Sequence, residues 1–81
     1  MSKNDIIVQI NAIIGEHFEI DTSAITPESD VRRTLDVDSL RATELIVIIN
    51  KKFDILMRPR QLSHLVTFGD VYDYIEKQLS I

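Results

Sequence analysis

A serine beside an aspartate, at the start of a helix-like segment, is the feature of this chain best suited to chemistry. Asp38-Ser39-Leu40 lies between a polar stretch and an apolar run that ends near Phe53. If Asp38 caps a helix, Ser39 falls in its first turn, where N–H groups are unpaired and the helix dipole is positive. A phosphate ester on the Ser39 hydroxyl would be stabilised there. The motif predicts an anionic attachment point, although plain helix capping fits the same residues.

The other reactive side chains form no catalytic or metal-binding set. The chain has no cysteine, so any thiol chemistry must come from an added group. Its two histidines, His17 and His64, lie far apart in the sequence without metal-ligand spacing. A triad of Ser39, His64 and Asp38 would place the acid beside the nucleophile, where it is poorly placed to orient the histidine. We therefore expect no catalytic residue and no metal site.

Length and charge narrow the function further. The chain of 81 residues, 44% of them hydrophobic, fits one small globular domain over residues 1–81 with little room for an enclosed enzyme site. A net charge of −4 argues against nucleic-acid binding, which depends on clustered basic charge. No apolar run approaches the roughly 20 residues that span a bilayer, and the first residues lack a signal-peptide pattern. We expect a cytoplasmic monomer without membrane insertion.

Apolar periodicity predicts four helices. The first covers roughly residues 3–16, with Gly15 near its end, and the second runs from about Ser39 to Phe53. A short third helix covers about residues 59–66, and the last begins after Thr67, with Asp70 completing a capping box. The long connection between the first two helices is expected to be ordered by apolar anchors, namely Phe18, Ile20, Ile25, Val31 and Leu35. The predicted fold is all-α, a small four-helix bundle with three main helices and a short third one.

The residues around Ser39 resemble those of acyl carrier proteins. The likeness includes Leu35-Asp36-Val37 before the Asp-Ser-Leu motif and extends from Ile25-Thr26-Pro27 to the segment Thr67-Phe68-Gly69-Asp70 and beyond, nearly the full chain. It implies that Ser39 carries 4′-phosphopantetheine, delivered from coenzyme A by a phosphopantetheinyl transferase that recognises Asp38 and Leu40. The thiol of that arm would hold an acyl thioester. Asp36 departs from the family pattern, which usually has glycine at this position.

The resemblance also implies two sets of binding residues. Acyl chains in this family are often sheltered between the second and third helices, and the corresponding wall would comprise Leu45, Ile46, Ile49, Ile55, Leu62 and Leu65. Acyl-loading, condensing or acyl-transfer enzymes would meet residues near Ser39 or on the route to it, namely Arg41, Thr43, Glu44, Val47, Lys51, Arg58 and Arg60.

Basic residues replace acidic ones at several of these positions. Fatty-acid carriers commonly have acidic residues where this chain has Arg41, Asn50 and Lys51, and Arg58-Pro59-Arg60-Gln61 replaces an acidic stretch. We therefore expect a specialised carrier in fatty-acid synthesis or in related lipid or secondary-metabolite synthesis. Two alternatives remain open: an aminoacyl or peptidyl carrier, and an unmodified helical interaction module of the same fold.

Overall fold

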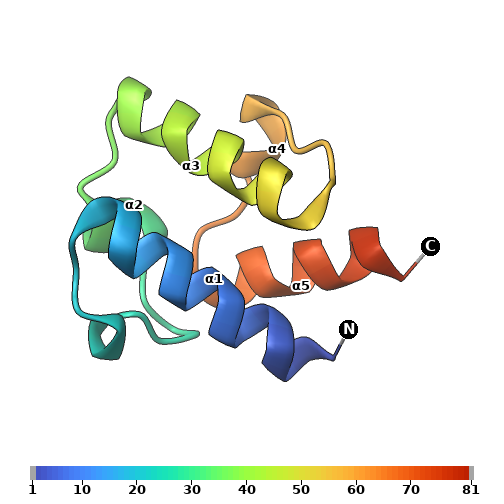
Figure 1. The fold of residues 1–81 in the computed structure, drawn as a ribbon. Coiled ribbons are helices and arrows are strands. Elements are labelled where there is room, and N and C mark those ends of the chain that lie inside the picture. Colours follow the sequence, from blue (N-terminus) through green and yellow to red (C-terminus); the bar gives the residue numbers. More distant parts are fainter. Residues whose placement is uncertain (1, 81) are drawn as a thin grey trace.

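The structure is a computed structural model that describes residues 2–80. Three long helices make up most of it. They are α1 (Lys3–Phe18), α3 (Ser39–Phe53) and α5 (Phe68–Leu79). Two short helices, α2 (Val31–Leu35) and α4 (Pro59–Leu62), and the 3-10 turn η1 (Thr22–Ala24) complete the elements of the described residues. In Figure 1, α1 lies beside α5, and α4 lies against α3. The prediction of a small all-α bundle is confirmed.

One apolar stripe from each long helix meets the others in a common core. On α1, Ile6, Ile10 and Ile14 recur every four residues and are completely buried. The stripes of α3 and α5 complete the core with Leu45, Ile46, Ile49, Phe53, Phe68, Val71, Tyr72 and Ile75. Two polar contacts join α1 to α5: an ion pair between Lys3 and Asp73, and a hydrogen bond of 2.5 Å from the Tyr72 hydroxyl to Asn11 Oδ1. This packing holds the rest of the chain in place.

The first helix is longer than predicted, because Gly15 does not end it. The helix continues to Phe18 and ends at Glu19, which has the left-handed backbone conformation (φ 56°) and donates its N–H to the Gly15 carbonyl. Gly15 serves close packing instead: a Cβ there would lie 2.8 Å from Cγ2 of Thr22 and 3.1 Å from the Ile20 oxygen. The prediction of an end at residue 16 was therefore wrong.

The connection between α1 and α3 is ordered and contains two elements that periodicity did not predict, η1 and α2. The anchors Ile25, Val31 and Leu35 are buried as predicted, whereas Phe18 and Ile20 are partly buried. Backbone hydrogen bonds pin the connection to the start of α5, where Gly69 N–H donates to the Pro27 carbonyl at 2.9 Å. The long connection thus fixes the segment that precedes Ser39.

The third predicted helix is shorter than expected. Only Pro59–Leu62 is α-helical, and the predicted range continued to residue 66. After Leu62 the chain forms tight turns, in which the His64 and Leu65 N–H groups bond to carbonyls three residues earlier. The Asn50 side chain holds the segment before α4, because it accepts from the Met57 N–H at 2.8 Å and donates to the Met57 carbonyl at 3.0 Å.

The predicted start of α5 is confirmed. Thr67 Oγ1 accepts from the Asp70 N–H at 3.2 Å, and the Asp70 carboxylate accepts from the Thr67 and Val66 N–H groups at 3.2 and 3.0 Å. Hydrogen bonds from the Thr67 and then the Val66 backbone hold the pKa of the Asp70 carboxyl below its usual value. The charged form of Asp70 therefore stabilises the folded state.

Asp70→Asn is expected to lower the free energy of unfolding at pH 7 by about 0.3–1 kcal/mol, the range for a charge at a helix start. Because the folded-state pKa is depressed, this stabilisation is present above the unfolded-state pKa, about 3.9, and is lost as the pH falls through the folded-state value. Urea unfolding at pH 7 and at about pH 3 checks this. The difference in unfolding free energy between wild type and Asp70→Asn should be smaller in acid, whereas Glu28→Gln, at an exposed position, should differ little from wild type at pH 7. A gap of constant size would contradict the role of the Asp70 charge.

Candidate functional site

The Asp-Ser-Leu motif lies at the start of α3, as its sequence pattern predicts. Asp38 is extended (φ −111°, ψ −171°) and caps the helix, since its Oδ1 accepts from the Arg41 N–H at 2.8 Å. Ser39 is the first residue of α3 and is exposed. Its carbonyl accepts from Thr43 Oγ1 at 3.0 Å, but its hydroxyl makes no hydrogen bond within residues 2–80. Ser39 therefore presents a free hydroxyl at the positive end of a 15-residue helix.

A tight turn through Asp36 directs the chain into this helix start. Asp36 ends α2 in the left-handed conformation (φ 50°), which side chains with a Cβ rarely adopt and which aspartate tolerates better than most. Its N–H and that of Val37 both donate to the Arg32 carbonyl, the latter at 2.9 Å. The positive φ gives the physical reason why glycine suits this position.

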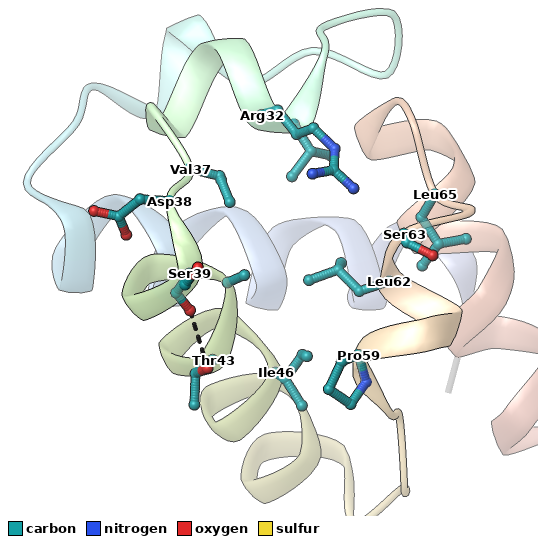
Figure 2. Close-up of a pocket in the computed structure, with 12 residues that line it drawn as sticks. Arg32, Val37, Asp38, Ser39, Thr43, Ile46, Pro59, Leu62, Ser63 and Leu65 are labelled. Carbon is teal, nitrogen blue, oxygen red and sulfur yellow. Dashed lines mark hydrogen bonds between the residues drawn. The ribbon is translucent and has the colours of Figure 1, made fainter.

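A cavity of about 500 Å³ lies beside Ser39, between α2, α3 and α4. Figure 2 shows its walls, with Ser39 on one side and Leu62, Ser63 and Leu65 on the other. Its lining is mostly apolar and comprises Val31, Arg32, Val37, Asp38, Ser39, Ala42, Thr43, Ile46, Pro59, Leu62, Ser63 and Leu65. The volume falls within the range of about 300–1,000 Å³ that is typical of ligand pockets.

Three of the six residues predicted to wall an acyl cavity line this one: Ile46, Leu62 and Leu65. The other three do not. Leu45 and Ile49 are 1% and 0% exposed and belong to the core, and Ile55 packs partly buried against it. The helical period explains why Leu45 and Ile49 do not line the cavity. Residues 39, 42, 43 and 46 share the face of α3 toward the cavity, whereas residues 45 and 49 lie on the adjoining face. Sequence reasoning missed the contribution of α2, whose Val31 and Arg32 also line the cavity.

Three residues predicted to bind partners make internal contacts. The Arg41 side chain donates to the Leu35 carbonyl at 3.0 Å, and its guanidinium carbon lies 5.9 Å from the centre of the Phe18 ring. It thus links α1, α2 and α3. Glu44 Oε2 lies 3.2 Å from His17 Nε2, and the Thr43 hydroxyl bonds within its own helix.

The remaining predicted partner-binding residues are open to solvent. Val47 is 48% exposed, and Lys51, Arg58 and Arg60 are also exposed. Leu40, next to the serine, is 66% exposed, a high value for a large apolar side chain. His64 is exposed and does not line the cavity. That partner enzymes bind Val47, Lys51, Arg58 and Arg60 stays a prediction.

No helix among residues 2–80 combines the length and hydrophobicity needed to cross a membrane.

The candidate site consists of a capped helix start, a free serine hydroxyl and an adjoining apolar cavity.

Comparison with known proteins is consistent with this geometry. A model of the family described as phosphopantetheine attachment site matches residues 8–75. The acyl carrier protein of Helicobacter pylori (strain J99) is 39% identical over 67 residues, which cover 83% of this chain and 86% of that protein. The acyl carrier protein of Exiguobacterium sp. (strain AT1b) is 35% identical over 79 residues, or 98% of this chain and 100% of that protein.

A solved structure agrees at the level of the fold. The acyl carrier protein from Enterococcus faecalis superposes with a TM-score of 0.79 at 22% identity, covering 96% of this chain and 99% of that one. Together with the family match over residues 8–75, the sequence relatives establish the relationship. The chain belongs to the acyl carrier protein family and contains its phosphopantetheine attachment domain.

Proposed function

We propose that Ser39 bears the 4′-phosphopantetheine arm and that the protein carries acyl groups for other enzymes. The observation that supports this most strongly is the exposed Ser39 hydroxyl, which has no internal hydrogen bond within residues 2–80 and lies at the capped start of α3. The site fits the group, because the helix start suits a phosphodiester and the adjoining cavity of about 500 Å³ suits an apolar chain.

The protein's own residues have simple roles in the attachment. The Ser39 oxygen forms a bond to the phosphorus of the phosphopantetheine phosphate as the bond to the nucleotide part of coenzyme A breaks, and the serine proton passes to the transferase. Asp38 holds Ser39 in place through its cap on Arg41 N–H, and exposed Leu40 gives the transferase an apolar contact. The attached group supplies a thiol, on which acyl groups are held as thioesters. Ser39 is thus a substrate of partner enzymes, and the protein itself is not an enzyme.

The exposed basic residues favour a specialised carrier. Lys51 lies in the last turn of α3, where it also complements the helix dipole, and Arg58 and Arg60 lie at the start of α4 beside the cavity-lining Pro59. Enzymes that dock basic surfaces on acidic carriers would meet like charge here. The dedicated loading, condensing or acyl-transfer partners should therefore be less basic. We further propose that the carrier serves fatty-acid synthesis or related lipid or secondary-metabolite synthesis. It would act as a monomer, with residues 1–81 forming one domain, in the cytoplasm.

Charge reversal tests this specialisation. The double variant Lys51→Glu, Arg60→Glu is expected to be loaded up to about tenfold faster by an acyltransferase of general fatty-acid synthesis at low salt, because rim charges act on the association rate. The gain should shrink as salt screens the contact. Lys77→Glu on α5 is the matched control and should change little. Equal or slower loading of the double variant would contradict the specialised-carrier proposal.

An unmodified interaction module of the same fold is the competing function. Intact mass after incubation with coenzyme A, Mg²⁺ and a broad-specificity transferase separates the two. A gain equal to one phosphopantetheine group supports the carrier, and an unchanged mass supports the module. Comparing loading of the modified protein by acyl-transfer enzymes and by amino-acid adenylating enzymes then distinguishes an acyl carrier from an aminoacyl carrier.

A further inference from the structure

The polar groups on the cavity wall are nearly all engaged in internal hydrogen bonds. The Asp38 carboxylate caps α3 at 2.8 Å, and the Thr43 hydroxyl donates to a backbone carbonyl of the same helix at 3.0 Å. The Ser63 hydroxyl donates to a carbonyl of α4 at 2.6 Å. Apart from the attachment hydroxyl of Ser39, this leaves the Arg32 guanidinium, which has no side-chain hydrogen bond or ion pair within residues 2–80.

Arg32 places this charge beside an apolar surface. It stands on α2, between Val31, which is 2% exposed, and the solvent-facing Arg33. Figure 2 shows its side chain extending from α2 over the cavity, across from Ile46 and Pro59. The wall around it is otherwise mainly aliphatic, comprising Val31, Val37, Ala42, Ile46, Pro59, Leu62 and Leu65.

Helix-dipole stabilisation does not distinguish Arg32 from its neighbour. Both Arg32 and Arg33 lie in the last turn of α2, where a cation is favourable. Only Arg32 lines the cavity. A hydrocarbon chain that filled the cavity would cover part of the guanidinium and offer it no hydrogen-bond acceptor, which is unfavourable. A chain that ends in a carboxylate would offer two acceptor oxygens in the geometry that a guanidinium binds best.

We propose that Arg32 selects acyl groups that bear a carboxylate at their far end over hydrocarbon chains of the same length. This inference rests on the proposed function, because the cargo reaches the cavity from the arm on Ser39. Arg32 is then a specificity-determining residue for the cargo. Its exposure leaves it free to move aside for an uncharged chain, so the selection is a preference of a few-fold.

Two six-carbon cargoes, hexanoyl and adipoyl, test the inference. Each is loaded from its coenzyme A thioester by a broad-specificity transferase, and intact mass verifies the loading. The rate of thioester cleavage by hydroxylamine is then divided by the rate for the same thioester of free pantetheine, which removes the intrinsic reactivity. In the wild type, adipoyl should be protected about two- to five-fold more than hexanoyl, the range for a partly exposed ion pair.

Two matched variants separate Arg32 from general charge. Arg32→Gln should abolish the extra protection of adipoyl and leave hexanoyl unchanged, whereas Arg33→Gln should preserve the difference. Adipoyl, but not hexanoyl, should also shift the Nε–H signal of Arg32 in ¹⁵N spectra. Circular dichroism checks that both variants fold.

Other outcomes overturn the inference. Equal protection of the two cargoes in the wild type, or equal effects of Arg32→Gln and Arg33→Gln, would show that Arg32 does not select cargo. Loss of protection of both cargoes in Arg32→Gln would mean that Arg32 contacts the arm itself. These results leave the carrier function intact, whereas a wild-type protein that gains no mass with either thioester overturns the proposed function and the inference with it.

Discussion

Replacing Ser39 by alanine is expected to abolish phosphopantetheine attachment and to leave the fold intact. The Ser39 hydroxyl is exposed and makes no hydrogen bond within the described residues 2–80, so its removal breaks no internal contact. Asp38 retains the helix cap, and alanine is a good helix former. The free energy of unfolding should change by less than about 0.5 kcal/mol. Intact mass after transferase treatment and urea unfolding measure the two effects.

Ser63→Ala is the matched control, because Ser63, the residue that follows α4, lines the same cavity. It should gain one phosphopantetheine group at the wild-type level. A Ser39→Ala protein that is still modified would place the arm elsewhere. A large loss of stability in Ser39→Ala would mean that the serine has a structural role.

The second large effect concerns the core side of α3. Ile49→Ala is expected to lower the free energy of unfolding by about 2–5 kcal/mol, because Ile49 is 0% exposed and its removal leaves a cavity. Small domains are stable by only about 5–15 kcal/mol, so the variant should be close to unfolding. Val47→Ala, two residues earlier and 48% exposed, should change stability by about 0.5 kcal/mol or less. Urea unfolding of the three proteins gives both values.

This pair also tests the face of α3 that the cavity uses. Ile46 lines the cavity and Ile49 does not, although both were predicted to wall it. A stable Ile49→Ala protein that sheltered its acyl thioester less well would contradict the arrangement described above. In that case Ile49 would belong to the cargo site and not to the core.

The sequence predicted best those features that depend on local pattern. The bounds of α3, Ser39–Phe53, follow from the Asp38 cap and the apolar period. The start of α5 follows from Thr67 and Asp70, three residues apart. Both are local signals, because the capping side chain and the amide that it binds lie within one turn.

Helix ends without glycine were harder to predict. Glu19, Asp36 and Asp54 all end helices in the left-handed conformation, with φ between 50° and 56°. Glycine is the usual residue there, so its absence hid the ends at Glu19 and Asp36. The end of α3 before Asp54 was predicted from the apolar period alone. In the first helix, Gly15 led to a predicted end that lies two residues too early. What glycine does at position 15 depends on Thr22, which packs against it, and no local pattern gives that contact.

The cavity wall could be predicted only in part, because it depends on how separate elements meet. α2 has five residues, too few to show a helical period, so the contributions of Val31 and Arg32 were not foreseen. Likewise, the sequence showed only that Asn50 stands where fatty-acid carriers commonly have an acidic residue. In the structure, its side chain hydrogen-bonds both the N–H and the carbonyl of Met57. These roles arise from tertiary contacts.

Locating the modification in the unmutated protein is the decisive test of the attachment site. The wild type is treated with coenzyme A, Mg²⁺ and a transferase, digested, and its peptides are fragmented in a mass spectrometer. The phosphopantetheine group should be found on the peptide that contains Ser39 and be assigned to that residue. Attachment to another hydroxyl, such as that of Ser29 or Ser63, or no attachment at all, would contradict the proposal that Ser39 bears the arm.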